Sequence, residues 1–125
     1  MIAIQSVTDK DKILEICENC GVEWHSALRV IATVENNVVL QHAIFEFDGE
    51  QGSIHSIGGF EEDLGMLDGL CRAILNIMEI HGVKQCYLSK KYRKLALAVG
   101  FKEENESFTV DLTTFFRCCC HKKGE

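Results

Sequence analysis

The sequence lacks the features that would place the chain in a membrane, on a secretory route or on a nucleic acid. No apolar run approaches the roughly 20 residues that a membrane-spanning helix needs. The first residues carry neither a basic segment nor an apolar stretch of signal-peptide length, so we expect a cytoplasmic protein. The 19 acidic residues outnumber the 13 Lys and Arg, and the net charge of -6 argues against tracking a phosphate backbone. We therefore expect no membrane partner and no nucleic-acid partner.

What the chain does have is the composition of one folded domain. It has 125 residues, of which 46% are hydrophobic and 26% are charged, and this balance suits a single core. No repeat, linker or low-complexity segment divides it. We expect one domain over residues 1–116 and a polar, cysteine-rich tail over residues 117–125.

The spacing of apolar residues alternates between strand and helix periods along the chain. It predicts, in order, a strand over 1–7, a helix between Thr8 and Gly21, strands over 27–34, 38–47 and 53–57, a helix from about Met66 to Gly82, a strand over 83–88, a helix over 89–99, and a hairpin of 101–104 with 107–112. This order is β-α-β-β-β-α-β-α-β-β. The three consecutive strands joined by short turns indicate an antiparallel meander. We expect an α/β fold, with a mixed central sheet and helices on both faces.

Two segments within this order resemble one family. The run 69–75 followed by 81–88 looks like the central helix and fifth strand of the GNAT acyl-CoA-dependent N-acetyltransferases. The segment Leu95-Ala96-Leu97-Ala98-Val99-Gly100-Phe101 resembles the family's ending "ALYxxLGF". The resemblance covers nearly the whole chain. It implies the GNAT fold and the transfer of an acetyl group from acetyl-CoA to an amine, either on a small molecule or on a protein lysine.

The family's phosphate-binding motif is largely missing. In the family the bend before the central helix carries R/Q-x-x-G-x-G/A, whose backbone N–H groups hold the pyrophosphate of coenzyme A. Counting back from the matched helix places this motif on residues 62–67, where only Gly65 fits. The resemblance assigns cofactor contacts at this bend to Leu64, Gly65 and Met66.

The residues around this bend are acidic or bulky. Glu61, Glu62 and Asp63 would repel a diphosphate, and Leu67 stands where the family has glycine or alanine. The alternative is that acidic residues favour the start of a helix for structural reasons.

A basic cluster follows the fifth predicted strand. Lys90, Lys91, Arg93 and Lys94 occupy the first turns of a helix, where cations oppose the helix dipole. In GNAT-like folds this helix start lies near the cofactor groove, so Lys90 and Lys91 are candidates to bind the cofactor. The alternative is a solvated basic face.

The resemblance also implies where the thioester is held. GNAT enzymes place it where the fourth and fifth strands splay apart, and backbone groups of the fourth strand bind the pantetheine arm. In this sequence that position corresponds to His55, Ser56 and Ile57, with Ser89 at the end of the fifth strand.

Acetyl transfer to an amine requires a base and an acid. His55 is the candidate base, because its ordinary pKa suits the task and Gln51, Ser53 and His55 share one strand face. The family often uses a tyrosine of its "ALY" segment as the acid, and Ala96 stands there. Tyr92, one helical turn earlier, is a displaced candidate. The alternatives are a hydrogen-bonded histidine within the sheet and an ordinary amphipathic-helix tyrosine.

The acceptor side is reduced. Family members commonly have a second helix before the second strand, and in this chain the short segment Val22-Glu23-Trp24-His25-Ser26 replaces it. The acceptor pocket is then open, small or completed by another chain. Trp24 and His25 are candidates to line it, and Trp24 is alternatively a core residue or a contact in a homodimer. The acidity of the chain favours a cationic amine.

Seven cysteines allow a metal-site alternative. Cys17 and Cys20 form a C-x-x-C pair, and Cys118-Cys119-Cys120-His121 adds further soft ligands. However, Cys17 and Cys20 also lie on the apolar stripe of the first predicted helix, and no second C-x-x-C supports zinc. We therefore expect reduced core thiols and no metal.

Two functions remain open from the sequence. The first is a GNAT-like N-acetyltransferase that binds acetyl-CoA through the strand splay and the basic helix start. The second is a non-catalytic GNAT-fold module that has lost coenzyme binding and acts through partner or self association. His55 and the basic cluster favour the first function, whereas Glu62, Leu67 and Ala96 favour the second.

Overall fold

The computed structural model describes residues 2–59 and 63–115. Its elements are β1 (Ile2–Ser6), α1 (Lys10–Asn19), β2 (Arg29–Glu35), β3 (Val38–Asp48), β4 (Gln51–Gly59), α2 (Leu64–Ile80), β5 (Gln85–Ser89), the 3-10 turn η1 (Lys90–Tyr92), α3 (Arg93–Val99), β6 (Lys102–Glu104) and β7 (Ser107–Asp111). The predicted order of helices and strands is confirmed. The predicted boundary between the domain and its tail falls at residues outside the described ranges and stays a prediction.

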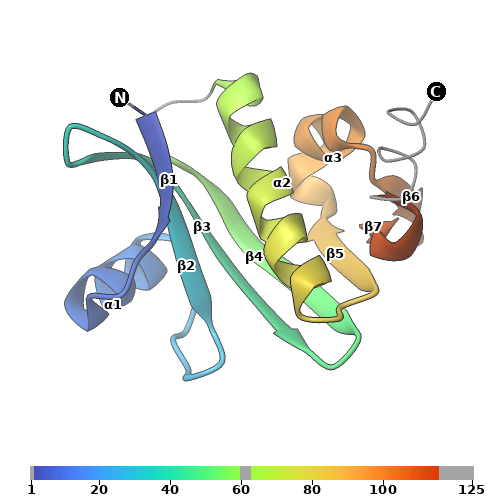
Figure 1. Cartoon of the computed structure of the whole chain (residues 1–125), viewed down its shortest axis with the longest axis horizontal. Helices are drawn as coiled ribbons and strands as arrows, with labels where there is room; N and C mark the ends of the chain where they lie inside the picture. Colours follow the sequence, from blue (N-terminus) through green and yellow to red (C-terminus); the bar gives the residue numbers. More distant parts are fainter. Residues whose placement is uncertain (1, 60–62, 116–125) are drawn as a thin grey trace.

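A single sheet of seven strands organises the molecule, in the order β1-β2-β3-β4-β5-β7-β6. The pairing of β4 with β5 is parallel, and the other pairs are antiparallel. Helix α1 covers one face, and α2 and α3 cover the other (Figure 1). The mixed sheet with helices on both faces is as the sequence predicts. No helix within the described residues is long and apolar enough to cross a membrane.

Each face of the sheet has its own hydrophobic core. The larger core lies under α2 and α3, where Leu70, Ile74 and Met78 of α2 are fully buried. The smaller core lies under α1 and contains Ile16, Cys17, Leu28, Val30 and Ile44. Buried apolar area is the main source of stability in such layers.

Turns and caps follow the local sequence closely. Asn36 and Asn37 both have positive φ angles, as a two-residue hairpin turn between twisted strands requires. Helix α1 begins after its N-cap Asp9, whose carboxylate accepts the N–H of Asp11 at 2.9 Å, so the helix starts later than the predicted boundary at Thr8. The last predicted helix starts instead with η1, and α3 follows at Arg93.

Strand β4 contains a bulge that changes which residues face α1. Ile44 lies opposite Ser56, but the next residue, Phe45, lies opposite Ile54, so His55 is an extra residue in the strand. As a result Ile54 and Ile57 both face the larger core. Ser56, opposite Ile44, faces the α1 side, as does His55.

Candidate functional site

The pairing of strands β4 and β5 ends about halfway along β4. They pair in parallel from Gln51 with Gln85 to Ile54 with Leu88. β5 then ends at Ser89, while β4 continues to Gly59. Figure 1 shows the two strands diverging towards the start of α2. We call this divergence, from Ile54 to Gly59 on one side and Leu88 to Tyr92 on the other, the strand opening.

A tyrosine hydroxyl lies at the strand opening. The backbone N–H of Ile57 points across it and donates to the hydroxyl of Tyr92 at 3.4 Å. Tyr92 ends the 3-10 turn and packs partly buried against the larger core, which holds its ring in place. Ser89 caps the same turn by accepting the N–H of Lys91 at 3.2 Å. The structure therefore places Tyr92, the candidate acid, beside Ile57 and on the turn that Ser89 caps, and these two residues belong to the expected thioester site.

His55 lies beside this opening on the α1 face and belongs to a cluster of three side chains. Its Nε2 is 2.5 Å from Oε1 of Glu46 on β3. The same oxygen is 3.5 Å from Nε2 of His25, which comes from the segment between α1 and β2. No local sequence signal marks Glu46, because it lies opposite Ser53 and its contact with His55 depends on the strand register and on the bulge.

The start of α2 is capped by an acidic side chain. Asp63 is the N-cap, and its carboxylate accepts the N–H of Met66 at 3.1 Å. A Cβ on Gly65 would lie 3.2 Å from that carboxylate oxygen, so glycine leaves the cap unobstructed. Leu67 packs against the larger core. An anion of the chain itself thus occupies the positive end of the helix. Glu61 and Glu62 lie outside the described residues.

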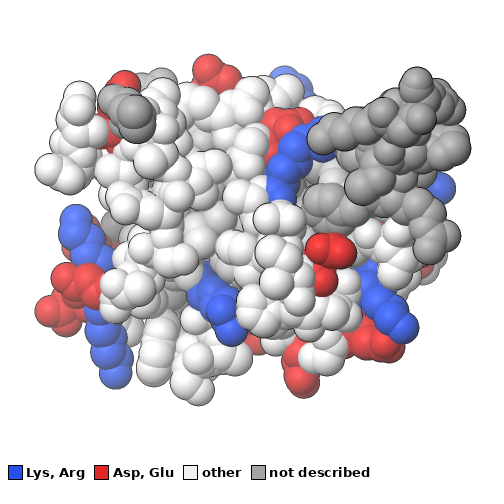
Figure 2. Space-filling model, viewed as in Figure 1, with Lys and Arg blue, Asp and Glu red and all other residues white. Residues whose placement is uncertain are grey.

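In the basic cluster, Lys90 and Arg93 form ion pairs with one acidic residue, whereas Lys91 lies near an aromatic ring. Lys90 and Arg93 both lie 3.3 Å from the carboxylate of Glu103 on β6. The hydrogen bond from Lys90, followed by the charge of Arg93, lowers the pKa of Glu103. Lys91 instead has its ammonium 5.6 Å from the ring centre of Tyr92. Acidic and basic groups are interspersed on the face seen in Figure 2, outside its grey region.

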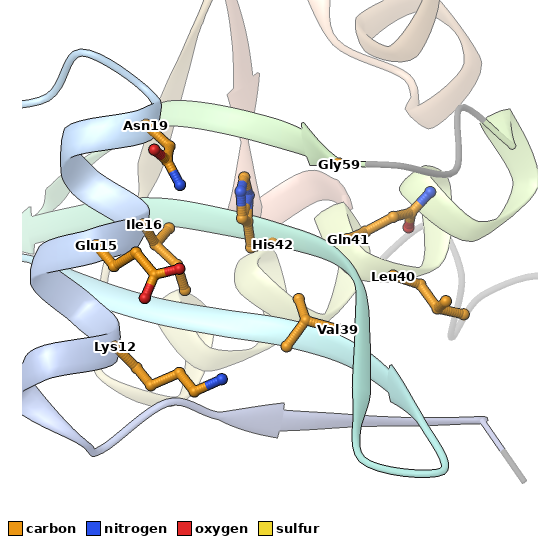
Figure 3. Close-up of a pocket in the computed structure, with 9 residues that line it drawn as sticks. All are labelled: Lys12, Glu15, Ile16, Asn19, Val39, Leu40, Gln41, His42 and Gly59. Atoms are coloured by element: carbon orange, nitrogen blue, oxygen red, sulfur yellow. The ribbon is translucent and has the colours of Figure 1, made fainter.

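A cavity of about 370 Å³ lies between α1 and β3, beside the end of β4 (Figure 3). The residues lining it are Lys12, Glu15, Ile16, Asn19, Val39, Leu40, Gln41, His42 and Gly59. Burial lowers the pKa of His42, whose Nε2 is 3.8 Å from Sγ of Cys20. His42 lies opposite Gly58, so the cavity is on the same face of the sheet as His55. No sequence pattern indicated this cavity.

Trp24 and Cys17, the acceptor-site and metal-site candidates, both pack in or against the smaller core. Trp24 packs partly buried against the smaller core, and the ammonium of Lys10 lies 4.8 Å from its ring centre. Cys17 is buried in the same core, and burial raises its thiol pKa. The described residues hold no group of three side chains suited to a metal ion. Residues 118–121 lie outside the described ranges.

Comparison with known proteins supports the fold through structure alone. No protein-family model matches the chain, and no curated protein matches it at a significant level. Solved structures match well. One is a GNAT-family protein from Desulfovibrio desulfuricans, with a TM-score of 0.71 and 12% identity over 90% of this chain and 99% of that one.

Two further structures carry functional descriptions. A GNAT-family acetyltransferase from Elizabethkingia anophelis with acetyl-CoA bound has a TM-score of 0.69 and 13% identity, covering 88% of this chain and 97% of its own. The ribosomal-protein-S18-alanine N-acetyltransferase from Escherichia coli has a TM-score of 0.66 and 14% identity, covering 87% and 90%. At identities this low, the structural match establishes the architecture, and activity has to be argued from the site itself. The chain has the fold of the GNAT acetyltransferases.

Proposed function

We propose that this chain is an N-acetyltransferase that transfers the acetyl group of acetyl-CoA to an amine. The observation that carries the proposal is the strand opening, where β4 extends beyond β5 and the N–H of Ile57 meets the Tyr92 hydroxyl. An open strand edge offers backbone groups to a ligand that contains amides. The acetyl-CoA-bound structure from Elizabethkingia anophelis supports the same use of this fold.

The residues present suit the two halves of acetyl-CoA unequally. At the strand opening, Ser56 and Ile57 of β4 and the hydroxyl of Tyr92 suit the amide-bearing pantetheine arm. At the start of α2, the backbone of Leu64, Gly65 and Met66 is where a diphosphate would bind, but the Asp63 carboxylate already caps it. Lys91, whose ammonium lies 5.6 Å from the ring centre of Tyr92, is the proposed cation for the diphosphate, because Lys90 already pairs with Glu103.

The proposed base, His55, and the proposed acid, Tyr92, lie on either side of the edge of β4. His55, on the α1 face, accepts a proton from the incoming ammonium group, which leaves a nucleophilic amine. Tyr92 accepts the Ile57 N–H through its oxygen, so its own hydroxyl proton can be donated to a leaving thiolate. Acetyl-CoA, when bound, supplies the activated thioester.

The acceptor is a small-molecule amine or a protein amine approaching from the α1 face. The short segment between α1 and β2 leaves this face without a second helix. A protein acceptor is consistent with the Escherichia coli neighbour, whose substrate is an alanine of ribosomal protein S18. Glu46 beside His55 favours a cationic amine by direct charge attraction.

Calorimetric titration tests donor binding. We expect heat on addition of acetyl-CoA at low salt, and weaker binding at physiological salt. Acetyl-pantetheine, which has no diphosphate, is the matched ligand. It should bind within about tenfold of acetyl-CoA if the strand opening supplies most of the affinity. No heat from either ligand at high protein concentration would contradict the proposal.

Turnover is tested separately by measuring thiol release from acetyl-CoA with a panel of primary amines and lysine peptides. Acetylated product identified by mass spectrometry supports the proposal. Binding without any product from the panel would restrict the function to coenzyme binding.

A further inference from the structure

His25, Glu46 and His55 form a cluster of two imidazole rings around one carboxylate. All three side chains are partly exposed, with 50%, 30% and 35% of their surfaces accessible. Exposed ion pairs contribute little to stability because water screens them. The cluster nevertheless lies on the face beside the strand opening, at the bulge of β4. Its position therefore favours a chemical role over a stabilising one.

We propose that Glu46 and His25 are positioning residues that fix which nitrogen of His55 takes the proton of the acceptor amine. This inference rests on the proposed acetyl transfer. It adds a histidine and a carboxylate to the site and assigns the reactive atom.

A backbone hydrogen bond orients the ring of His25. Its Nδ1 is 3.3 Å from the backbone N–H of Ala27, so Nδ1 must act as the acceptor. In the neutral ring the proton is then on Nε2, the atom that faces Glu46. A backbone group thereby sets the tautomer of His25.

Glu46 fixes the tautomer of His55, and His25 faces the same carboxylate oxygen. An ionised carboxylate only accepts hydrogen bonds, and Oε1 faces Nε2 of both imidazole rings. His55 must therefore donate from Nε2, and in its neutral form Nδ1 carries the lone pair. Carboxylate and imidazole pairs commonly fix ring tautomers in this way.

The proton then follows a balanced path. The ammonium group gives a proton to Nδ1 of His55, and the resulting imidazolium lies against the Glu46 carboxylate. The free amine forms a bond to the acetyl carbon, its nitrogen releases its second proton to solvent, and the carbon–sulfur bond breaks as the thiolate receives the proton of Tyr92. His55 later releases its proton to solvent, and Tyr92 regains one from solvent.

Nuclear magnetic resonance of the free protein tests the geometry without any substrate. We expect a strongly downfield ring N–H proton from His55, which His55→Gln removes and so assigns. Glu46→Gln should abolish its downfield shift, whereas Glu46→Asp should keep part of it. The matched control Glu18→Gln removes an exposed acid of α1 and should leave the resonance unchanged. An unshifted His55 ring proton in the wild type would overturn the proposal.

Kinetics with acetyl-CoA and ethylamine as the probe test the consequence. Glu46→Gln should lower kcat by roughly ten- to a hundredfold, as loss of a partner that orients a histidine commonly does. His25→Gln should lower kcat less, and Glu46→Asp should recover part of the rate. The KM for acetyl-CoA should stay within about twofold. Equal kcat values in Glu46→Gln and Glu18→Gln would overturn the positioning role.

The two experiments distinguish failure of the proposed acetyl transfer from failure of the proposed positioning of His55. A wild-type protein that shows the downfield proton but turns over no amine contradicts the proposed acetyl transfer, and with it the catalytic use of the cluster. Turnover without the downfield proton contradicts only the positioning of His55.

Discussion

The two regions proposed to bind acetyl-CoA, the strand opening and the start of α2, are built differently. At the strand opening the contact is made by the backbone of Ile57 and one hydroxyl, and it depends on where β5 stops. At the start of α2 the N–H groups are backbone as well, but a side chain, Asp63, decides what they can bind. Binding of the donor at a site made by strand geometry tolerates changes of side chain, whereas binding at a helix end is altered by one residue. The four predictions below test this contrast.

The largest effect is expected at the strand end. Tyr92→Phe removes the hydroxyl that faces Ile57 and should lower kcat about a hundredfold, while acetyl-CoA still binds. Thiol release and calorimetry measure the two quantities. Tyr87→Phe is the control, because that hydroxyl donates to Gln85 instead, at 3.1 Å. Equal losses in both variants would remove Tyr92 from the chemistry.

The stability of the fold should be sensitive to Gly59, which ends β4 before the start of α2. Gly59 has a φ of 153°, and a Cβ there would lie 2.4 Å from the carbonyl oxygen of Leu40. Gly59→Ala should therefore cost about 1–3 kcal/mol of unfolding free energy in urea titrations. The neighbouring Gly58→Ala meets no atom within 4 Å and should change stability by about 0.5 kcal/mol or less. Similar losses in both would contradict the close approach.

The helix end should improve when its charge is removed. Asn caps helices about as well as Asp, so Asp63→Asn should keep α2 intact while it deletes the charge that opposes a diphosphate. We expect acetyl-CoA to bind about two- to fivefold more tightly at low salt, with less gain at high salt. Asp9→Asn, at the corresponding cap of α1, should leave the affinity unchanged. Unchanged affinity in Asp63→Asn would place the diphosphate elsewhere.

The smallest effect is expected from the basic cluster. Lys91→Gln should weaken acetyl-CoA binding by about twofold at low salt, because exposed charges act through screened attraction. Lys90→Gln should do less, since its ammonium already pairs with Glu103. Calorimetry on the two variants compares them directly, and a larger loss in Lys90→Gln would reverse the assignment.

The fold could be predicted because each element has its own local signal. Apolar spacing predicted α2, and the short gap between the predicted strands 27–34 and 38–47 predicted the turn that Asn36 and Asn37 form. The 3-10 turn at Lys90–Tyr92 was missed, since helical spacing does not distinguish it from the first turn of a longer helix.

The site was predictable only where it follows from strand order. Ile57 and Tyr92 were selected from the resemblance, and the structure places them in contact. Glu46 was missed because its pairing with His55 requires the exact register of β3 with β4. The Asp63 cap was foreseen as a charge near the helix start, but its bond to Met66 needs coordinates.

The single extra residue at His55 has a consequence for how such an edge arises. Side chains and N–H groups along a strand alternate with the same two-residue parity. One inserted residue reverses that parity for everything after it, including Ile57. Beyond His55, a length change of one amino acid therefore exchanges the backbone N–H groups that point towards β3 with those that point away from it, and the N–H of Ile57 points away, to the hydroxyl of Tyr92.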